Sequence, residues 1–192
     1  IIEVTVATEI TEELLADKMA LHIEMMDENY LRADILGISL ATEEKTLYIP
    51  FAVAKESDVL KKWLQADDKK KYSSDSKAAL ASMSRFNFAI QGIEFDLLLA
   101  SYIVNPATTY TDVASIAREF GNMEVQHDEA IYGKGAKKAE PTEEVVAEHA
   151  SRKAQAIWKL RPIVKEKLKE YGQFDLYHDL ELPLASILGK ME

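Results

Sequence analysis

The stretch Lys18-Met-Ala-Leu-His-Ile-Glu-Met-Met26 decides the fold, because its side chains suit a strand with two different faces. Successive side chains of a β-strand point to opposite sides of the sheet. The odd-numbered residues from Met19 to Met25 would therefore point one way, and the even-numbered residues from Ala20 to Met26 the other. We predict a buried strand that places a histidine and a carboxylate, His22 and Glu24, side by side on one face.

The order of the predicted elements favours an α/β fold. Runs of apolar residues between polar turns predict strands at residues 2–6, 19–26, 35–41, 46–51 and 69–72. Helical spacing predicts helices at residues 11–17, 58–64, from 75 onward, 95–104, 111–120 and 143–171, with a last amphipathic segment at 176–188. This order predicts a mixed β-sheet of about five strands flanked by α-helices.

The composition indicates one soluble domain. The chain has 192 residues, 47% of them hydrophobic, and no linker rich in Gly, Pro or Ser, so we expect a single domain over residues 1–192. The apolar runs are too short to cross a bilayer, so no membrane partner is expected. There is no cysteine and no secretory signal, which favours a cytoplasmic location. The chain starts with Ile1 and ends inside a helical pattern, so we expect it to be cut from a longer protein.

The net charge of −10 limits how the chain can bind DNA. Proteins that grip nucleic acid by neutralising phosphates usually carry an excess of basic residues. Acidic nucleases instead place divalent cations between their carboxylates and the phosphate. Whether this chain can bind metal ions therefore decides whether it can act as a nuclease.

Four ordered stretches resemble the 3′–5′ exonuclease domain of bacterial DNA polymerase I, and together they span nearly the whole chain. They are Ile35-Leu-Gly-Ile-Ser-Leu40 with Leu47-Tyr-Ile-Pro50, Gly92-Ile-Glu-Phe-Asp-Leu-Leu-Leu-Ala-Ser-Tyr-Ile-Val-Asn-Pro106, Glu129-Ala-Ile-Tyr-Gly-Lys-Gly135 and Glu181-Leu-Pro-Leu-Ala-Ser-Ile-Leu188. The resemblance implies a ribonuclease H-like fold and a parent enzyme of DNA replication and repair. It also implies that the polymerase domain of the same chain is the partner, with the last helix leading into it.

The resemblance further implies a two-metal site built from four acids, of which this chain keeps one. The first motif, Asp-x-Glu, aligns with His22 and Glu24. The second motif supplies an Asp, which aligns with Ala79. The third motif, Tyr-x-x-x-Asp on the long helix, aligns with Arg152 and Ala156. These five residues define a vestigial exonuclease pocket.

The chemistry of the pocket predicts an inactive domain. Two hard cations about 4 Å apart need several carboxylates, and a single Glu24 cannot hold them. His22 would suit a softer ion such as zinc, but no set of four ligands is evident. If Arg152 faces the pocket, its charge would fill the space of a metal and pair with Glu24. We therefore expect no metal, no cofactor and no catalytic residue, and a structural role in the parent polymerase.

Two alternatives remain open at this stage. Lys134, Lys137 and Lys138 are a possible nucleic-acid contact, which would make the domain a residual binder of single-stranded DNA 3′ ends. A glycine-rich lysine loop is more often a solvated turn, and the net charge predicts weak or absent DNA binding by the isolated domain. The second alternative is a weak metal-dependent 3′–5′ exonuclease that uses Glu24, His22 and a borrowed ligand. The other histidines, His127, His149 and His178, are interpreted as surface or packing residues.

Overall fold

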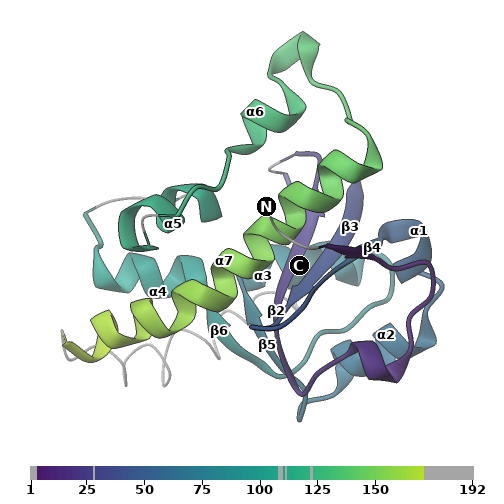
Figure 1. Ribbon diagram of the computed structural model, residues 1–192, viewed down its shortest axis with the longest axis horizontal. Coiled ribbons are helices and arrows are strands. Elements are labelled where there is room, and N and C mark those ends of the chain that lie inside the picture. The colour runs from purple at the N-terminus through teal and green to yellow at the C-terminus, as the bar shows by residue number, and fades with distance from the viewer. Residues whose placement is uncertain (1–3, 28, 108–109, 111, 122, 171–192) are drawn as a thin grey trace.

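One mixed sheet of six strands forms the centre of the molecule. The computed structural model describes residues 4–27, 29–107, 110, 112–121 and 123–170. The strands are β1 (Thr5–Val6), β2 (Lys18–Met25), β3 (Ile35–Ala41), β4 (Thr46–Pro50), β5 (Lys70–Ser73) and β6 (Ile93–Asp96), in the sheet order β1-β4-β3-β2-β5-β6. Strands β2, β3 and β4 form an antiparallel meander, and β1, β5 and β6 add parallel pairs at its two sides (Figure 1). The predicted mixed sheet is confirmed, with one strand more than expected.

Helices cover both faces of this sheet. They are the 3₁₀ turns η1 (Glu12–Leu14) and η2 (Gly135–Lys137) and the helices α1 (Phe51–Ala54), α2 (Asp58–Gln65), α3 (Ser76–Ser84), α4 (Leu97–Val104), α5 (Val113–Gly121), α6 (Asp128–Tyr132) and α7 (Glu143–Glu170). Ser57, Asp75 and Asp96 cap α2, α3 and α4 by accepting from the backbone N–H three residues later, as expected for N-caps.

Three predicted elements differ from the structure. The helix expected after Thr11 is a single 3₁₀ turn, because the chain is already extended at Leu15 on its way into β2. Residues 93–96 form β6, although part of this stretch was expected to begin a helix, because they pair in parallel with β5. Phe51, expected at the end of a strand, begins α1. The predicted segment at 176–188 lies outside the described residues, and the domain extent of 1–192 stays a prediction.

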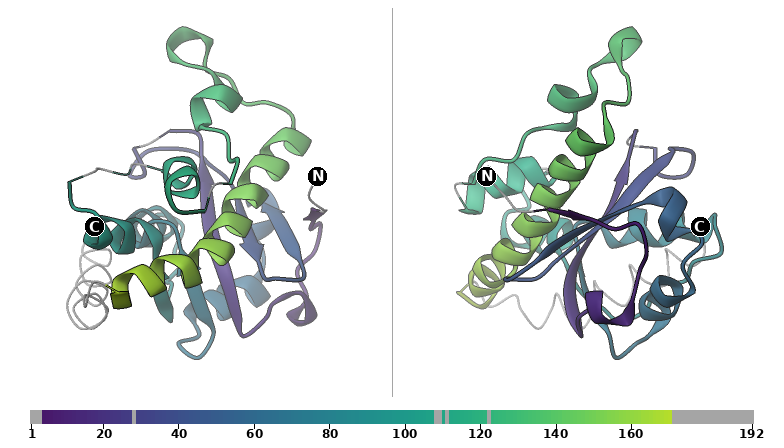
Figure 2. Two further views of the ribbon diagram at one scale, coloured as in Figure 1. Left: turned by 60° about the vertical axis from the view of Figure 1, so that its left-hand side comes forward. Right: turned by 45° about the vertical axis from the view of Figure 1, so that its right-hand side comes forward.

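The predicted alternation in β2 separates two cores. Met19, Leu21 and Ile23 pack in a cluster that includes residues of α2 and α3. Ala20 faces the opposite side, where it belongs to a cluster with residues of α4, α5 and α7. The views in Figure 2 show α7 crossing the sheet on this second side. The two faces of β2 are therefore buried in separate layers, as its sequence predicts.

Polar contacts fix the position of α7 above β3 and β4. The Ser39 hydroxyl donates to the Ala150 carbonyl at 2.8 Å, and Gln155 Nε2 donates to Thr46 Oγ1 at 2.6 Å. Small residues on the facing surfaces, such as Ala20, Ala41 and Ala154, allow the helix to lie close to the strands. The first half of α7 is thereby held beside the end of β2, where His22 and Glu24 lie.

Candidate functional site

A cleft of about 230 Å³ lies between the end of β2, the start of α3 and the first half of α7. Strand β2 brings His22 and Glu24 to it, and α3 begins there with the cap residue Asp75. The far side is closed by Asp128, the first residue of α6, and by Lys153 of α7. The cleft thus gathers side chains from segments that are far apart in the sequence.

Lys153 lies at the centre of the polar contacts in this cleft. Its Nζ donates to Glu24 Oε1 at 2.9 Å and to Asp128 Oδ1 at 2.5 Å, and only 6% of the side chain is exposed. Burial alone would lower the pKa of Lys153, but the charges of Glu24 and Asp128 outweigh burial and raise it above its ordinary value. Burial would raise the pKa of Glu24, yet Lys153 and His22 together lower it. Both members of the buried pair are therefore charged near neutral pH.

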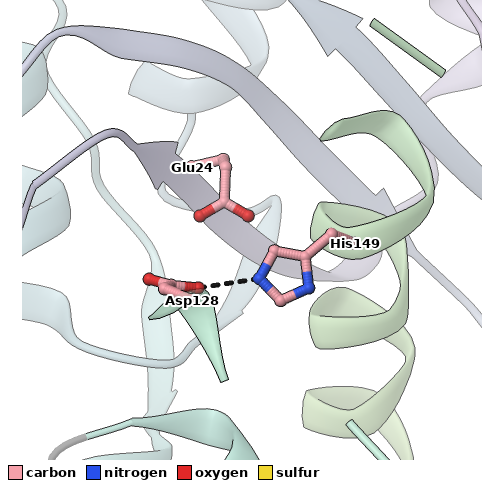
Figure 3. Close-up of side chains that lie close together, drawn as sticks. All are labelled: Glu24, Asp128 and His149. Atoms are coloured by element: carbon pink, nitrogen blue, oxygen red, sulfur yellow. Dashed lines mark hydrogen bonds and ion pairs between the residues drawn. The ribbon is translucent and has the colours of Figure 1, made fainter. Parts of the chain in front are cut away.

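Asp128 binds a second residue of α7. Its Oδ1 accepts from His149 Nε2 at 2.7 Å, and Figure 3 shows these two side chains and Glu24 converging from three elements. Burial would raise the pKa of Asp128, but the hydrogen bond from His149 and the charge of Lys153 hold it well below its usual range. The ring of Tyr132 meets the ring of His149 edge-on, with 5.8 Å between centroids. Asp128 is thus held as a carboxylate against α7.

His22 joins the same network from the strand side. Its Nδ1 lies 3.0 Å from Ser74 Oγ, and its Nε2 lies 3.5 Å from Glu24 Oε1. Burial lowers the pKa of His22, and this effect outweighs the opposing influence of Glu24. His22 is therefore neutral at neutral pH, so Lys153 supplies the positive charge that faces Glu24.

The predicted pocket residues are only partly brought together. His22, Glu24 and Ala79 all line the cleft, as the resemblance implied. The interpretation of Arg152 as the cation that pairs with Glu24 is wrong, because its guanidinium pairs with Glu148 one turn away, at 2.8 Å. Ala156 packs in the core between α7 and the sheet and is not among the residues that line the cleft.

The third motif is displaced by one turn of α7. The positions that face Glu24 and are four apart are His149 and Lys153, three residues before the pair inferred from the sequence. The sequence held a signal for the correct pair. His149 and Lys153 each lie three residues after a member of the predicted apolar stripe, Val146 and Ala150, and residues three apart lie on the same side of a helix. Sequence reasoning also missed Asp128, and it interpreted His149 only as a surface or packing residue.

The remaining predicted residues lie outside the cleft. Lys134, Lys137 and Lys138 belong to the connection between α6 and α7, where Lys134 lies 4.0 Å from Glu129 and Lys138 lies 4.0 Å from Asp27. Their role in nucleic-acid contact stays a prediction. His127 is a surface residue, as expected, with its ring nitrogen 2.8 Å from Asp112. His178 lies outside the described residues.

The network contains a set of atoms that could coordinate one cation. Glu24, Asp128 and His149 each offer an oxygen or nitrogen, and these atoms lie within 4.8 Å of one another. Two carboxylates and an imidazole suit a single ion such as zinc or manganese better than a pair of magnesium ions. The Lys153 ammonium already binds two of the three residues, so a metal ion would have to compete with it.

The sheet, the crossing helix and the cleft together define a domain of the ribonuclease H-like class. A solved structure of Escherichia coli RNase D, an exoribonuclease involved in structured RNA processing, has this fold with a TM-score of 0.72 and 16% identity, and the match covers 93% of this chain and 46% of that one. A family model described as "DNA polymerase I, ribonuclease H-like domain" matches residues 21–160. The chain therefore belongs to this family, the 3′–5′ exonuclease-like domains of bacterial DNA polymerase I.

The chain matches only part of the length of its curated relatives. DNA polymerase I of Bacillus subtilis is 43% identical over 191 residues, which is 100% of this chain and 22% of the relative. DNA polymerase I of Geobacillus stearothermophilus is 41% identical over 187 residues, which is 97% of this chain and 21% of the relative. The chain thus spans about a fifth of the length of these relatives. Among the described residues, no helix has the length and apolar character that a membrane span requires.

Proposed function

We propose that the chain is a 3′–5′ exonuclease-like domain that has lost metal-dependent cleavage, and that its role in the parent DNA polymerase is structural. The observation that carries this proposal is the Lys153 ammonium, which bridges Glu24 and Asp128 in the cleft. A positive side chain at this place does by itself what a bound cation would do, because it neutralises the carboxylates that face each other. The domain then folds around its cleft without a cofactor.

The ligands that remain do not fit a two-metal mechanism. That mechanism needs two cations about 3.5–4 Å apart, one to activate water and one to stabilise the leaving oxygen. Of the aligned motif positions, Glu24 alone supplies a carboxylate, while Ala79 supplies none and Lys153 repels a cation. Asp128 comes from α6 and is already bound by Lys153 and His149. Among the described residues, the one group of side chains placed to hold a cation together is Glu24, Asp128 and His149, which supports at most a single ion.

A second candidate function is favoured by the cluster of Glu24, Asp128 and His149. In this candidate a single ion displaces the Lys153 ammonium and supports weak 3′–5′ exonuclease activity. The displaced ammonium would have to leave two charge-assisted hydrogen bonds inside a buried site, which opposes binding of the ion. This cost favours the inactive domain over the weak nuclease.

The test is a metal titration of the wild-type chain and two single variants. Lys153→Ala removes the bridging ammonium, whereas Arg152→Ala removes the neighbouring cation, which pairs with Glu148 outside the cleft. We expect Zn²⁺ or Mn²⁺ to raise the melting temperature of Lys153→Ala and to leave the wild type and Arg152→Ala unchanged. In parallel, a labelled single strand incubated with Mg²⁺ or Mn²⁺ should keep its length with the wild type. Shortening that Glu24→Gln abolishes would refute the proposal in favour of the weak nuclease.

The relatives support a proposal about the partner and location of the domain. Because the matched proteins are whole bacterial DNA polymerases, the partner we propose is the polymerase domain of the same parent chain, in the cytoplasm. DNA would then reach the domain through the parent enzyme.

A further inference from the structure

Ser74 lies at the turn where strand β5 passes into helix α3. Strand β5 ends at Ser73, and Asp75 caps α3 by accepting from the backbone N–H of Ala78 at 3.2 Å, so Ser74 alone joins the strand to the cap residue. Ser74 is 9% exposed and lines the cleft. A sharp turn from a strand into a helix is also where α/β-hydrolases hold a nucleophilic serine. The fold therefore fixes one hydroxyl in the wall of the cleft.

A histidine faces this hydroxyl. His22 Nδ1 lies 3.0 Å from Ser74 Oγ, and His22 Nε2 lies 3.5 Å from Glu24 Oε1. A carboxylate only accepts hydrogen bonds, so Glu24 favours the tautomer of His22 that carries its proton on Nε2. Nδ1 then holds a lone pair, and the Ser74 hydroxyl donates to it. The distance of 3.0 Å falls within the range of about 2.6–3.2 Å that connects a nucleophile to its base.

The sheet and Glu24 hold the ring of His22 in this orientation. His22 pairs with Ser39 of β3, and β2 is also paired with β5, so the backbone beneath the ring is fixed from both sides. Glu24 is itself held in place by Lys153, whose Nζ lies 2.9 Å from Glu24 Oε1. A nucleophile, a base and a group that orients the base are the three parts of a serine hydrolase site. Strand β2 and the turn before α3 bring all three parts together.

The cleft around Ser74 suits a small uncharged ligand. Its volume of about 230 Å³ lies below the range of about 300–1,000 Å³ that is usual for drug-sized ligands. Asp75, Asp112 and Asp128 are among its lining residues, where Lys153 is the cation that opposes them, so an anionic ligand is disfavoured. The apolar part of the wall includes Leu21, Ile23, Met25, Ala78, Leu98 and Val113. An uncharged ester with a short acyl chain is the class of ligand that fits these properties.

We propose that Ser74 and His22 form a nucleophile–base pair that hydrolyses short uncharged esters, with Glu24 as a positioning residue. Ser74 Oγ attacks the ester carbonyl carbon while its proton passes to His22 Nδ1, and the alcohol then leaves with that proton as its C–O bond breaks. Water attacks the acyl-serine and gives a proton to His22, which returns it to Ser74 as the carboxylic acid leaves. The backbone N–H of Asp75 follows the nucleophile, which is the position of an oxyanion donor in such a turn. The reaction needs no metal ion, so it goes beyond the proposed structural role.

The test is covalent labelling of the 192-residue chain by a short-chain alkyl fluorophosphonate in the presence of EDTA. Such a probe forms an O–P bond with an activated serine and releases fluoride. We expect peptide mass spectrometry to locate the adduct on Ser74, and Ser74→Ala to remain unlabelled. His22→Gln should slow labelling by about 100-fold or more, because it removes the base. Two matched controls, Ser84→Ala on the exposed side of α3 and His127→Gln on the surface, should keep the wild-type rate.

The role of Glu24 is tested by the ¹⁵N NMR shifts of the His22 ring, which a purely structural role would not move. We expect the proton on Nε2 in the wild type and a mixture of tautomers in Glu24→Gln. A proton on Nδ1 in the wild type would overturn the proposal, as would a wild type that takes up no label or is labelled on another residue. Melting temperatures show whether each variant folds. If Ser74→Ala does not fold, the position of the adduct in the wild type decides the question by itself.

Discussion

The Nζ atom of Lys153 lies 2.9 Å from Oε1 of Glu24, although 129 positions separate the two residues in the chain. Each side chain is nearly inaccessible to solvent, with 6% and 1% exposed. Burying a single unpaired charge at such depth is strongly unfavourable. Each residue therefore offsets the free-energy cost of burying the charge of the other. This ion pair connects the central strand to the helix that crosses it, and it also determines which chemistry the cleft can support.

Removing both partners of this pair should cost less than the sum of the costs of removing each one alone. Lys153→Met leaves Glu24 without its cation, and we expect it to lower the free energy of unfolding by about 3–5 kcal/mol. The double variant Glu24→Gln/Lys153→Met should lose clearly less than the sum of the two single variants. Urea unfolding gives these values. Arg152→Ala, the matched control, should lose only about 0.5 kcal/mol, since it breaks a partly exposed pair within one helix. Additive losses would show that the pair is not coupled.

Acid should weaken the fold through Glu24. The pKa of this carboxyl is lowered in the folded protein, so its contribution to stability is complete above its unfolded value, near 4.5, and is lost as the pH falls below that. We expect the free energy of unfolding to fall more steeply with decreasing pH in the wild type than in Glu24→Gln. Denaturant titrations between pH 7 and pH 3 measure this difference. Parallel curves for the two proteins would contradict the assignment.

Asp96 should have the opposite effect over a different pH range. Burial raises the pKa of this carboxyl to about 7, even though it accepts from the backbone N–H groups of Ser76 and Leu99. Between its unfolded value of about 3.9 and pH 7 the folded state keeps the proton that the unfolded state has lost, so stability falls as the pH rises. Carboxyl NMR titration should place the midpoint near 7. A midpoint near 4 would show that the hydrogen bonds to the backbone outweigh burial.

Gly37 should be intolerant of a side chain while Tyr48 is present. A Cβ atom at position 37 would lie 2.3 Å from the hydroxyl of Tyr48, which donates to the Leu36 carbonyl from the neighbouring strand. We expect Gly37→Ala to destabilise the protein by about 1–3 kcal/mol, as overpacking usually does. The same substitution in a Tyr48→Ala background should be much less harmful, and thermal unfolding of the four proteins tests this. Equal losses in both backgrounds would exclude the ring as the cause.

The sequence was most informative where side chains alternate along a strand. The pattern around Met19, Leu21 and Ile23 placed His22 and Glu24 correctly on the face that forms the cleft. Strand β6 was missed because its four residues are followed directly by α4, so one apolar run serves two elements. Periodicity alone does not reveal where such a run changes its conformation.

The site residues on α7 and α6 could not be predicted from the sequence. Several pairs of residues on α7 are four apart, and the sequence does not show which pair faces Glu24. Arg152 and Ala156 were therefore predicted at the cleft, where the structure places His149 and Lys153. Asp128 begins a five-residue helix with no periodic signal, and tertiary packing alone brings it to the cleft. The candidate site was thus predictable from the strand side and not from the helix side.

The most direct test of the central claim is the anomalous electron density of Mn²⁺ in crystals of the wild-type chain soaked in that ion. The account predicts density for the Lys153 ammonium between Glu24 and Asp128, and no anomalous peak within coordination distance of either carboxylate. Two anomalous peaks about 4 Å apart, bridged by carboxylates with the lysine displaced, would contradict it.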